Sequence, residues 1–171
     1  TALNFIQRMS GIAALAVMFC EKVKDLPVVL LDTRKTTPGL RRFEKYAVSC
    51  GGVRNHRMGL YDMVMIKDNH IAAAGSITEA VHKVNYYMMK KGITVPVEVE
   101  TATLEQVREA AGLPLQRIML DNMDLKSIRS AVELINGKSI VEVSGRISMS
   151  DLRPLVDAGV DGGVCGAIAF R

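Results

Sequence analysis

Short apolar runs alternate with amphipathic stretches along most of the chain. Each run is rich in Val, Ile and Leu, as expected for a strand that is buried on both faces of a parallel sheet. The six predicted strands cover residues 28–32, 62–66, 95–100, 117–121, 139–144 and 160–166. Strands that alternate with helical patterns in this way predict successive βα units.

Helix boundaries between the runs are marked by capping residues. Ser76 with Glu79, and Thr103 with Gln106, have the spacing of capping boxes. Before the stop at Asn136-Gly137, helical spacing is shown by Leu125, Ile128, Val132 and Ile135. We expect further helix ends at Gly92, Gly112 and Gly159.

The fold class is therefore α/β, with two candidate architectures. Six units are fewer than the eight of a closed TIM barrel, which takes about 250 residues. An open, incomplete TIM-like α/β barrel and an open doubly wound sheet both fit the pattern. The chain has no GxGxxG, Walker or nucleophile-elbow motif to decide between them.

Composition indicates one soluble domain. The chain has 171 residues, 49% of them hydrophobic, and no uninterrupted apolar run long enough for a membrane helix. Three scattered cysteines without a CxxC pair favour a reducing compartment, and we expect a cytoplasmic protein. The net charge of +4 is mild, and acidic residues lie among the basic ones. A small anionic substrate explains it better than a nucleic acid or a membrane surface.

Polar residues of functional type stand where the predicted strands end. They are Arg34, Lys35, Lys67, Glu100, Asp121, Ser144, Gly145 and Gly166. In a parallel barrel these strand ends open onto one face, where the active site is built. Each residue also has an ordinary structural explanation, such as a solvated loop, a surface ion pair or a turn.

The residue types point to a polyanionic ligand that contains a sugar phosphate. A cationic pocket would form from Arg34, Lys35, His56, Arg57 and Lys67. Glu100 and Asp121 are oxygen ligands suited to Mg²⁺ or to ribose hydroxyls. Backbone N–H groups at Ser144-Gly145 and Gly166 could approach a phosphate, near a helix start at Ser150.

Six motifs in register resemble the quinolinate phosphoribosyltransferases. They are DTRKTTPG at 32–39, EKYA at 44–47, NHRMGL at 55–60, IKDNHI at 66–71, VEVE at 97–100 and MLDN at 119–122. The likeness runs from residue 1 to about residue 161. It implies an open, incomplete barrel that follows a sandwich domain, and a homodimer or higher oligomer. In such a dimer the sandwich of one subunit covers the barrel of the other.

The resemblance also implies the reaction and the residues that serve it. Quinolinate and phosphoribosyl pyrophosphate would give nicotinate mononucleotide, pyrophosphate and CO₂, with Mg²⁺ as cofactor. Quinolinate carboxylates and nearby phosphate oxygens would be held by Arg34, Lys35, His56, Arg57 and Lys67. Glu100 and Asp121 would bind the ribose and the metal, and Ser144, Gly145 and Gly166 the 5′-phosphate. The residues expected to be catalytic are Lys35, Lys67, Glu100 and Asp121.

Two departures from the family pattern concern the phosphate site. Arg146 stands where a second glycine is usual, and the run 162–169 is unusually rich in glycine. We interpret residues 1–171 as the barrel alone, without the sandwich domain or the family's C-terminal helix; a transit peptide upstream would change the compartment to an organelle. Two alternatives remain: a related phosphoribosyltransferase-like barrel with another substrate, and a truncated, non-catalytic scaffold.

Overall fold

The structure, a computed structural model, describes residues 1–160 and 163–165. Six parallel strands form one sheet in the order β1-β6-β5-β4-β3-β2. The strands are β1 (Leu30–Leu31), β2 (Val64–Ile66), β3 (Val97–Thr101), β4 (Arg117–Asp121), β5 (Ile140–Ser144) and β6 (Gly163–Cys165). Every predicted strand is confirmed, and β4 has the predicted bounds. The strands β1 and β2 are shorter than the predicted runs, and β3 and β5 begin later than predicted; of the run 160–166 the structure describes Gly163–Cys165 as strand.

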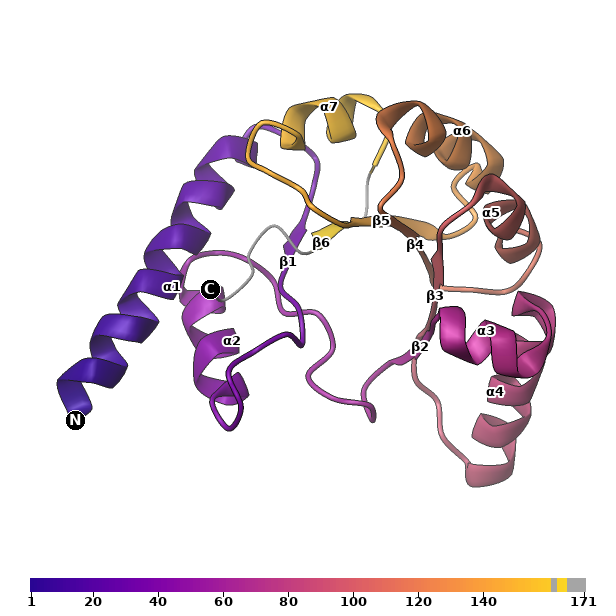
Figure 1. Cartoon of the computed structure of the whole chain (residues 1–171), viewed down its shortest axis with the longest axis horizontal. Coiled ribbons are helices and arrows are strands. Elements are labelled where there is room, and N and C mark those ends of the chain that lie inside the picture. The colour runs from indigo at the N-terminus through magenta and orange to yellow at the C-terminus, as the bar shows by residue number, and fades with distance from the viewer. Residues whose placement is uncertain (161–162, 166–171) are drawn as a thin grey trace.

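The helices decide the architecture. They are α1 (Ala2–Val23), α2 (Arg41–Cys50), α3 (Asp68–Ala74), α4 (Ile77–Lys91), α5 (Leu104–Ala110), α6 (Leu125–Ile135) and α7 (Leu152–Asp157). Figure 1 shows the sheet as a curved wall with the helices around its outside. The edge strands β1 and β2 do not pair with each other. Leu31 of β1 forms an isolated parallel β-bridge with Arg54, which lies in the connection between β1 and β2. The open, incomplete barrel is confirmed, and the doubly wound sheet is excluded because it needs helices on both faces.

The strands bury different side chains on their two faces. Val99, Ile118 and Val141 belong to the large core between the sheet and the outer helices. Met119 and Leu31 face the other way and form a small second cluster with the half-buried Val29 and Met65. Because side chains alternate along a strand, the polar residues in register with Met119 also face the interior of the curved wall.

Most of the predicted helix boundaries are confirmed. The Ser76 and Thr103 hydroxyls accept hydrogen bonds from the backbone N–H groups of Glu79 (3.1 Å) and Gln106 (3.3 Å). Asn136 ends α6 in the left-handed conformation, and Gly92 ends α4 in the same way. Gly112 was expected to act likewise but keeps a negative φ, because α5 ends one residue earlier at Ala111 with right-handed geometry.

Helix α1 lies against α2 at the β1 end of the sheet. A Cβ atom on Gly51, at the end of α2, would meet the Cβ of Ala16 at 2.4 Å, so the glycine permits this close approach. By length and hydropathy α1 could cross a membrane, since its 22 residues include a window of mean hydropathy 1.4. Arg8 of α1, however, pairs with the buried Glu44 of α2 at 2.7 Å, and Phe19 is buried in the core. These contacts favour a helix of the domain.

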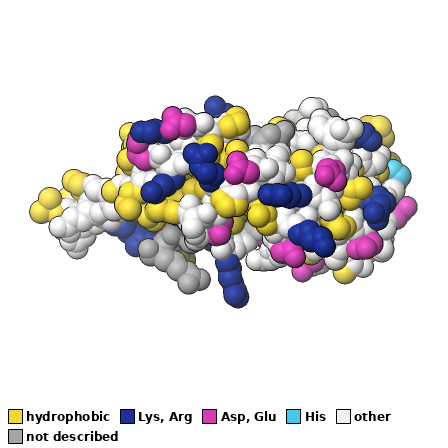
Figure 2. All heavy atoms as spheres, turned by 90° about the horizontal axis from the view of Figure 1, so that it is seen from above, with side chains coloured by type: hydrophobic (Ala, Val, Ile, Leu, Met, Phe, Trp, Pro, Cys, Tyr) yellow, Lys and Arg dark blue, Asp and Glu magenta, His cyan; other side chains and the backbone are white. Residues whose placement is uncertain are grey.

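The surface carries charges of both signs. Figure 2 shows basic and acidic side chains interspersed over one face, with hydrophobic side chains gathered at the end where α1 begins. Exposed apolar residues on α1 include Leu3, Ile6 and Met18. The viewed face has no continuous basic stripe of the kind that nucleic-acid binding needs.

Candidate active site

The site is organised around Asp32, which directly follows β1 and is fully buried. Its Oδ1 accepts hydrogen bonds from the Lys45 ammonium of α2 and from the backbone N–H of His56 at 2.7 Å. Burial raises the pKa of the Asp32 carboxyl, and the contacts with Lys45 and His56 oppose that rise. One carboxylate therefore ties together β1, α2 and the segment that leads to β2.

The loop after β1 presents Arg34 and Lys35 and is held by α2. Glu44 accepts a hydrogen bond from the backbone N–H of Thr37 at 3.0 Å, and Arg41 donates to the carbonyl oxygen of Arg34 at 3.3 Å. Lys35 is exposed. Arg34 is half-buried, and its Nε has no hydrogen-bond partner in the described part of the chain.

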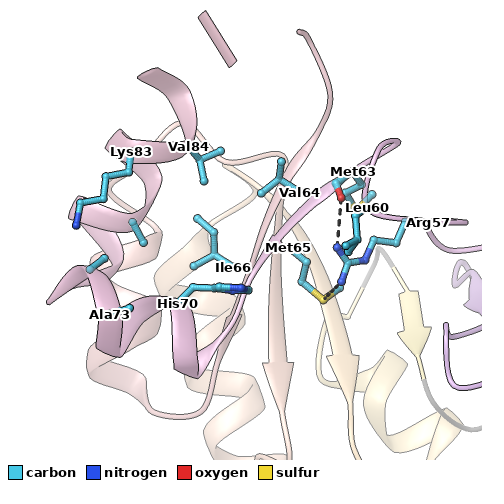
Figure 3. Close-up of a pocket in the computed structure, with 12 residues that line it drawn as sticks. Arg57, Leu60, Met63, Val64, Met65, Ile66, His70, Ala73, Lys83 and Val84 are labelled. Carbon is cyan, nitrogen blue, oxygen red and sulfur yellow. Dashed lines mark hydrogen bonds between the residues drawn. The ribbon is translucent and has the colours of Figure 1, made fainter. Parts of the chain in front are cut away.

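Arg57 lies near Arg34 in the fold. Its guanidinium donates to the carbonyl oxygen of Met63 at 3.3 Å and contacts the Met65 sulfur at 3.4 Å (Figure 3). Burial lowers the pKa of Arg57, and the positive charge of Arg34 lowers it further. Two half-buried guanidiniums that repel each other make a site whose electrostatic energy falls when an anion binds between them.

Lys67 and Glu100 connect the cationic side of the site to the strand ends. Lys67 follows β2, Glu100 belongs to β3, and the two side chains form an ion pair. Their side chains are 39% and 18% exposed, so the pair remains accessible to a ligand. From the sequence, Lys67 was either a site residue or a member of an ordinary surface ion pair. In the structure its partner is Glu100, which is itself a predicted site residue.

Asp121 and Ser144 end adjacent strands and are partners in the β4–β5 register. Asn122 follows in a left-handed conformation, and its backbone N–H donates to the Ser144 carbonyl oxygen at 2.9 Å. Gly145 has a φ of +137°, and a Cβ there would lie 2.8 Å from the Asn122 side-chain oxygen. The positive φ and this close approach explain why residue 145 is a glycine.

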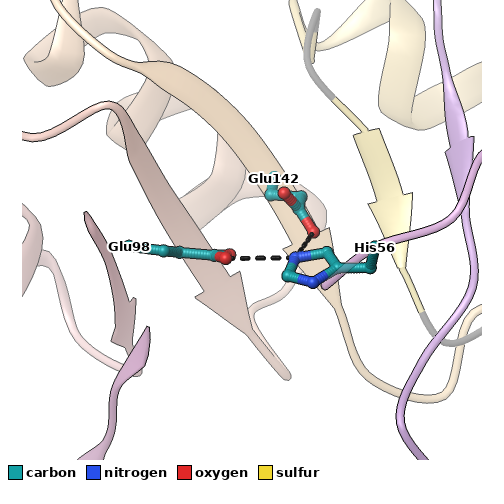
Figure 4. Close-up of side chains that lie close together, drawn as sticks. All are labelled: His56, Glu98 and Glu142. Carbon is teal, nitrogen blue, oxygen red and sulfur yellow. Dashed lines mark ion pairs between the residues drawn. The ribbon is translucent and has the colours of Figure 1, made fainter. Parts of the chain in front are cut away.

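A cluster of buried ionisable groups lies inside the wall (Figure 4). Nε2 of His56 is 3.0 Å from Glu98 Oε2 and 3.0 Å from Glu142 Oε1, and both glutamates are fully buried. Arg117 donates to the other oxygen of Glu142 at 2.8 Å. Burial tends to lower the pKa of His56, but the contacts with Glu142 and Glu98 outweigh it and raise the pKa to about 9. Burial raises the pKa of Glu98.

The arrangement of these three side chains resembles a set of metal ligands. Within residues 1–160 and 163–165 they form the one group of three or more candidate ligand atoms that lie within 4.8 Å of one another. The backbone N–H of Arg57 points at Nδ1 of His56 at 2.8 Å, so a proton of the ring sits on Nε2. A protonated Nε2 has no lone pair for a metal, and this chemistry does not fit a cation site.

Two cavities lie at the strand ends. The larger, about 380 Å³, lies beside β2 under α3 and α4 and is lined mainly by apolar residues (Figure 3). It shares only Arg57 with the predicted site, so its size does not mark the reaction centre. The smaller, about 300 Å³, is lined by Ser144, Gly145 and Arg146 together with Asn122. It coincides with the predicted phosphate site.

The structure brings most of the predicted residues together, with three qualifications. Gly166 lies outside the described residues. Glu100 and Asp121 project from neighbouring strands but belong to no cluster of three candidate metal ligands among the described residues. The predicted start of α7 near Ser150 falls at Asp151, and the helix spans only six residues.

Sequence reasoning missed the buried groups that hold the site. Asp32 and Lys45 stood inside quoted motifs but received no role. In the structure Glu98 contacts His56 and Glu100 contacts Lys67. The alternation of Glu98 with Glu100 signalled that both face one side of β3, but their partners come from distant segments.

Comparison with known proteins shows the family to which the chain belongs. Residues 12–170 match the family model described as quinolinate phosphoribosyl transferase, C-terminal domain. The chain belongs to this family. A chloroplastic nicotinate-nucleotide pyrophosphorylase (carboxylating) of Arabidopsis thaliana is 49% identical over 92% of this chain. A probable nicotinate-nucleotide pyrophosphorylase of Synechocystis is 45% identical over 94% of it.

Solved structures of the family share the fold. The nicotinate-nucleotide pyrophosphorylase of Ehrlichia chaffeensis superposes with a TM-score of 0.90 at 41% identity over 98% of this chain and 60% of that one. NadC from Streptococcus pyogenes gives 0.88 at 44% identity, over 98% of this chain and 57% of that one. The chain spans 49% and 54% of the lengths of the Arabidopsis and Synechocystis relatives.

Proposed function

We propose that this chain is the catalytic barrel of a quinolinate phosphoribosyltransferase (decarboxylating). The observation that carries the proposal is the cationic side of the site, where the half-buried guanidiniums of Arg34 and Arg57 repel each other and Lys67 follows β2. Two carboxylates on one pyridine ring match such a set, because guanidinium groups bind carboxylates in a bidentate manner. The relatives named for this activity support the same substrate pair, quinolinate and phosphoribosyl pyrophosphate.

The arrangement serves the reaction by positioning and charge. The pyridine nitrogen forms a bond to ribose C1′ as the bond from C1′ to pyrophosphate breaks. The bond to the 2-carboxylate then breaks, CO₂ leaves and the ring carbon takes up a proton. Lys67 lies where the two halves of the site meet and stabilises negative charge there. Such a reaction requires no covalent nucleophile from the protein, so the contribution of the chain is orientation and electrostatics.

The acidic side of the site fits a magnesium ion. Mg²⁺ binds through one or two carboxylates together with substrate phosphates, and Glu100 and Asp121 are carboxylates at adjacent strand ends. An ion bound there would neutralise negative charge on the pyrophosphate. Ser144 and Gly145 are the groups of the smaller cavity that would approach the 5′-phosphate.

The assembly and the compartment are further proposals. We infer a homodimer, in which exposed apolar residues of α1 such as Leu3 and Ile6 are covered by the rest of the protein. Analytical ultracentrifugation of the full-length protein tests this. Cytoplasmic location stays a prediction, since the plant relatives are named as chloroplastic and mitochondrial forms.

The decisive experiment compares quinolinate with nicotinate in the full-length protein. Buried donors left unpaired by a missing carboxylate should make nicotinate a poor substrate, by a factor on the order of 10⁴ in kcat/KM. Formation of nicotinate mononucleotide and release of ¹⁴CO₂ are the measurements. Comparable efficiency on the two pyridines would contradict the assignment and favour a barrel with another substrate. No turnover with any pyridine carboxylate would favour a scaffold.

A further inference from the structure

The interior of the curved wall contains four buried or half-buried charged groups from four different segments. Glu98 lies on β3, Arg117 on β4, Glu142 on β5, and His56 on the segment between β1 and β2 (Figure 4). Glu98 and Glu100 lie on the same face of β3, two residues apart. Glu98 is thus further from the carboxyl end of β3 than Glu100, and the cluster lies below the Glu100–Lys67 pair of the active site.

The two glutamates of this cluster have different numbers of charged partners. Glu142 has both Arg117 at 2.8 Å and His56 at 3.0 Å. Glu98 is fully buried, its side-chain oxygens accept no hydrogen bond among the described residues, and His56 is its ion-pair partner. A buried carboxylate with so little compensation costs several kcal/mol unless a cation stands beside it. The histidine supplies that cation.

The dependence is mutual. His56 directly precedes Arg57, whose guanidinium belongs to the proposed carboxylate site. The His56 backbone is fixed separately by Asp32. Asp32 fixes the backbone of His56, so the two glutamates determine the orientation and the charge of the ring. Both contact Nε2, the ring nitrogen that points toward the interior strands.

We propose that Glu98 and Glu142 are positioning residues of the dicarboxylate site, which hold the His56 ring by Nε2 and keep it cationic beside Arg57. The inference rests on the proposed function for its substrate, quinolinate. It assigns a role to groups that lie beneath the site and do not touch the ligand. The glutamates act on quinolinate through His56, and the phosphoribosyl side of the site is independent of them.

The expected pH dependence follows from the raised pKa of His56. The groups that face this histidine are Glu98, Arg117 and Glu142 on the strands, Asp32 with its partner Lys45, and the adjacent Arg57. Protonation on Nδ1 displaces the Arg57 N–H, but two ionic contacts in a buried site outweigh one neutral hydrogen bond. The cation is present below pH 9 and is lost as the pH rises through about 9. Loss of either glutamate should move that limit to lower pH.

The test uses Glu98→Gln and Glu142→Gln in the full-length protein. The first readout is the titration of the His56 side chain by NMR, with its signal assigned from a His56→Asn variant. We expect each amide variant to lower the His56 pKa by about one unit or more. The second readout is kinetics. The KM for quinolinate should rise on the order of tenfold, and the alkaline limb of kcat/KM for quinolinate should shift down, while the KM for phosphoribosyl pyrophosphate stays within about twofold.

Glu109→Gln is the matched control. Glu109 is a half-buried glutamate that accepts hydrogen bonds from Thr78 between α4 and α5, in the outer helix layer. Its replacement removes a partly buried carboxylate without touching His56, so neither the titration nor the pH profile should change. A purely structural role for Glu98 and Glu142 would lower thermal stability and leave both readouts at their original values.

The outcomes separate this inference from the proposed function. An unchanged His56 titration in both variants overturns it, and so does a shifted titration with a normal KM and pH profile for quinolinate. If the unmodified protein neither binds nor converts quinolinate, the proposed function fails. The NMR titration then still decides whether the glutamates set the charge of His56.

Discussion

The two sides of the site are built in different ways. The acidic side stands on β3, β4 and β5, which have five residues each and pair in continuous parallel register. The cationic side stands on segments next to β1 and β2, which have two and three residues and are the open edges of the sheet. A backbone ladder positions the first, and buried side-chain contacts position the second.

The difference shows where the molecule is sensitive to single substitutions. A ladder of backbone hydrogen bonds survives the loss of one side chain. The cationic segments depend on a few contacts, among them Asp32 with Lys45 and Glu44 with Thr37. Removal of one of these should therefore affect both folding and the site, whereas substitutions at the strand ends should affect ligands alone.

The largest effect is expected from Asp32→Ala. It leaves the fully buried Lys45 ammonium without its carboxylate, which should cost about 3–5 kcal/mol in the free energy of unfolding. Urea denaturation measures the loss. Glu21→Ala, which breaks an exposed pair with Lys24, is the control and should cost less than about 1 kcal/mol. The double variant Asp32→Ala/Lys45→Met should recover part of the stability, and no recovery would show that the ion pair is not the cause.

Lys67→Ala tests the place where the two sides meet. Since the Lys67–Glu100 pair is partly exposed, unfolding should change by less than about 1 kcal/mol. Loss of the ammonium from the reaction centre should lower kcat/KM by about 10²- to 10³-fold. Steady-state kinetics and thermal melting give the two quantities. Lys138→Ala, at an exposed position just before β5, is the control. Near-normal kcat/KM of the Lys67 variant would contradict the role proposed for Lys67.

Glu100→Gln and Asp121→Asn should separate the two sides. If these carboxylates serve the ribose and the metal, each change should weaken binding of phosphoribosyl pyrophosphate about tenfold and leave quinolinate within about twofold. Isothermal titration calorimetry with and without Mg²⁺ measures both ligands. Weakened quinolinate binding with intact phosphoribosyl pyrophosphate binding would place the two residues on the other side of the site.

The smallest effect is expected from Arg146→Gly, which restores the residue usual in the family. Arg146 is exposed and lines the smaller cavity with Ser144 and Gly145. A solvent-screened charge near a phosphate contributes little, so the KM for phosphoribosyl pyrophosphate should rise by about two- to fivefold. The change should shrink further in 0.5 M salt. A lower KM in the glycine variant would show that the arginine obstructs the phosphate.

Much of the fold was predictable because it is local. The positions of β3, β4 and β5 follow from short apolar runs with polar ends, and Ser76 and Thr103 mark their helices through contacts three residues away. The exceptions also have local causes that the pattern does not reveal. Gly112 was expected to end α5, but the helix ends one residue earlier. The runs at β1 and β2 were expected to be longer, and the lack of a second neighbour at the sheet edge leaves fewer backbone partners there.

The sequence by itself determined the βα order, the strand ends that carry the site and, through its motifs, the family. Periodicity alone did not distinguish an open barrel from a doubly wound sheet; the motif resemblance implied the barrel, and the structure shows the curved sheet with open edges. Only the tertiary structure decided which carboxylate meets which cation. Glu98 and Glu142 lie 42 and 86 residues from His56 in the sequence, yet both reach its ring nitrogen at 3.0 Å. Periodicity tells which face of a strand a side chain occupies, but the partner across a barrel depends on curvature, and no local pattern encodes it.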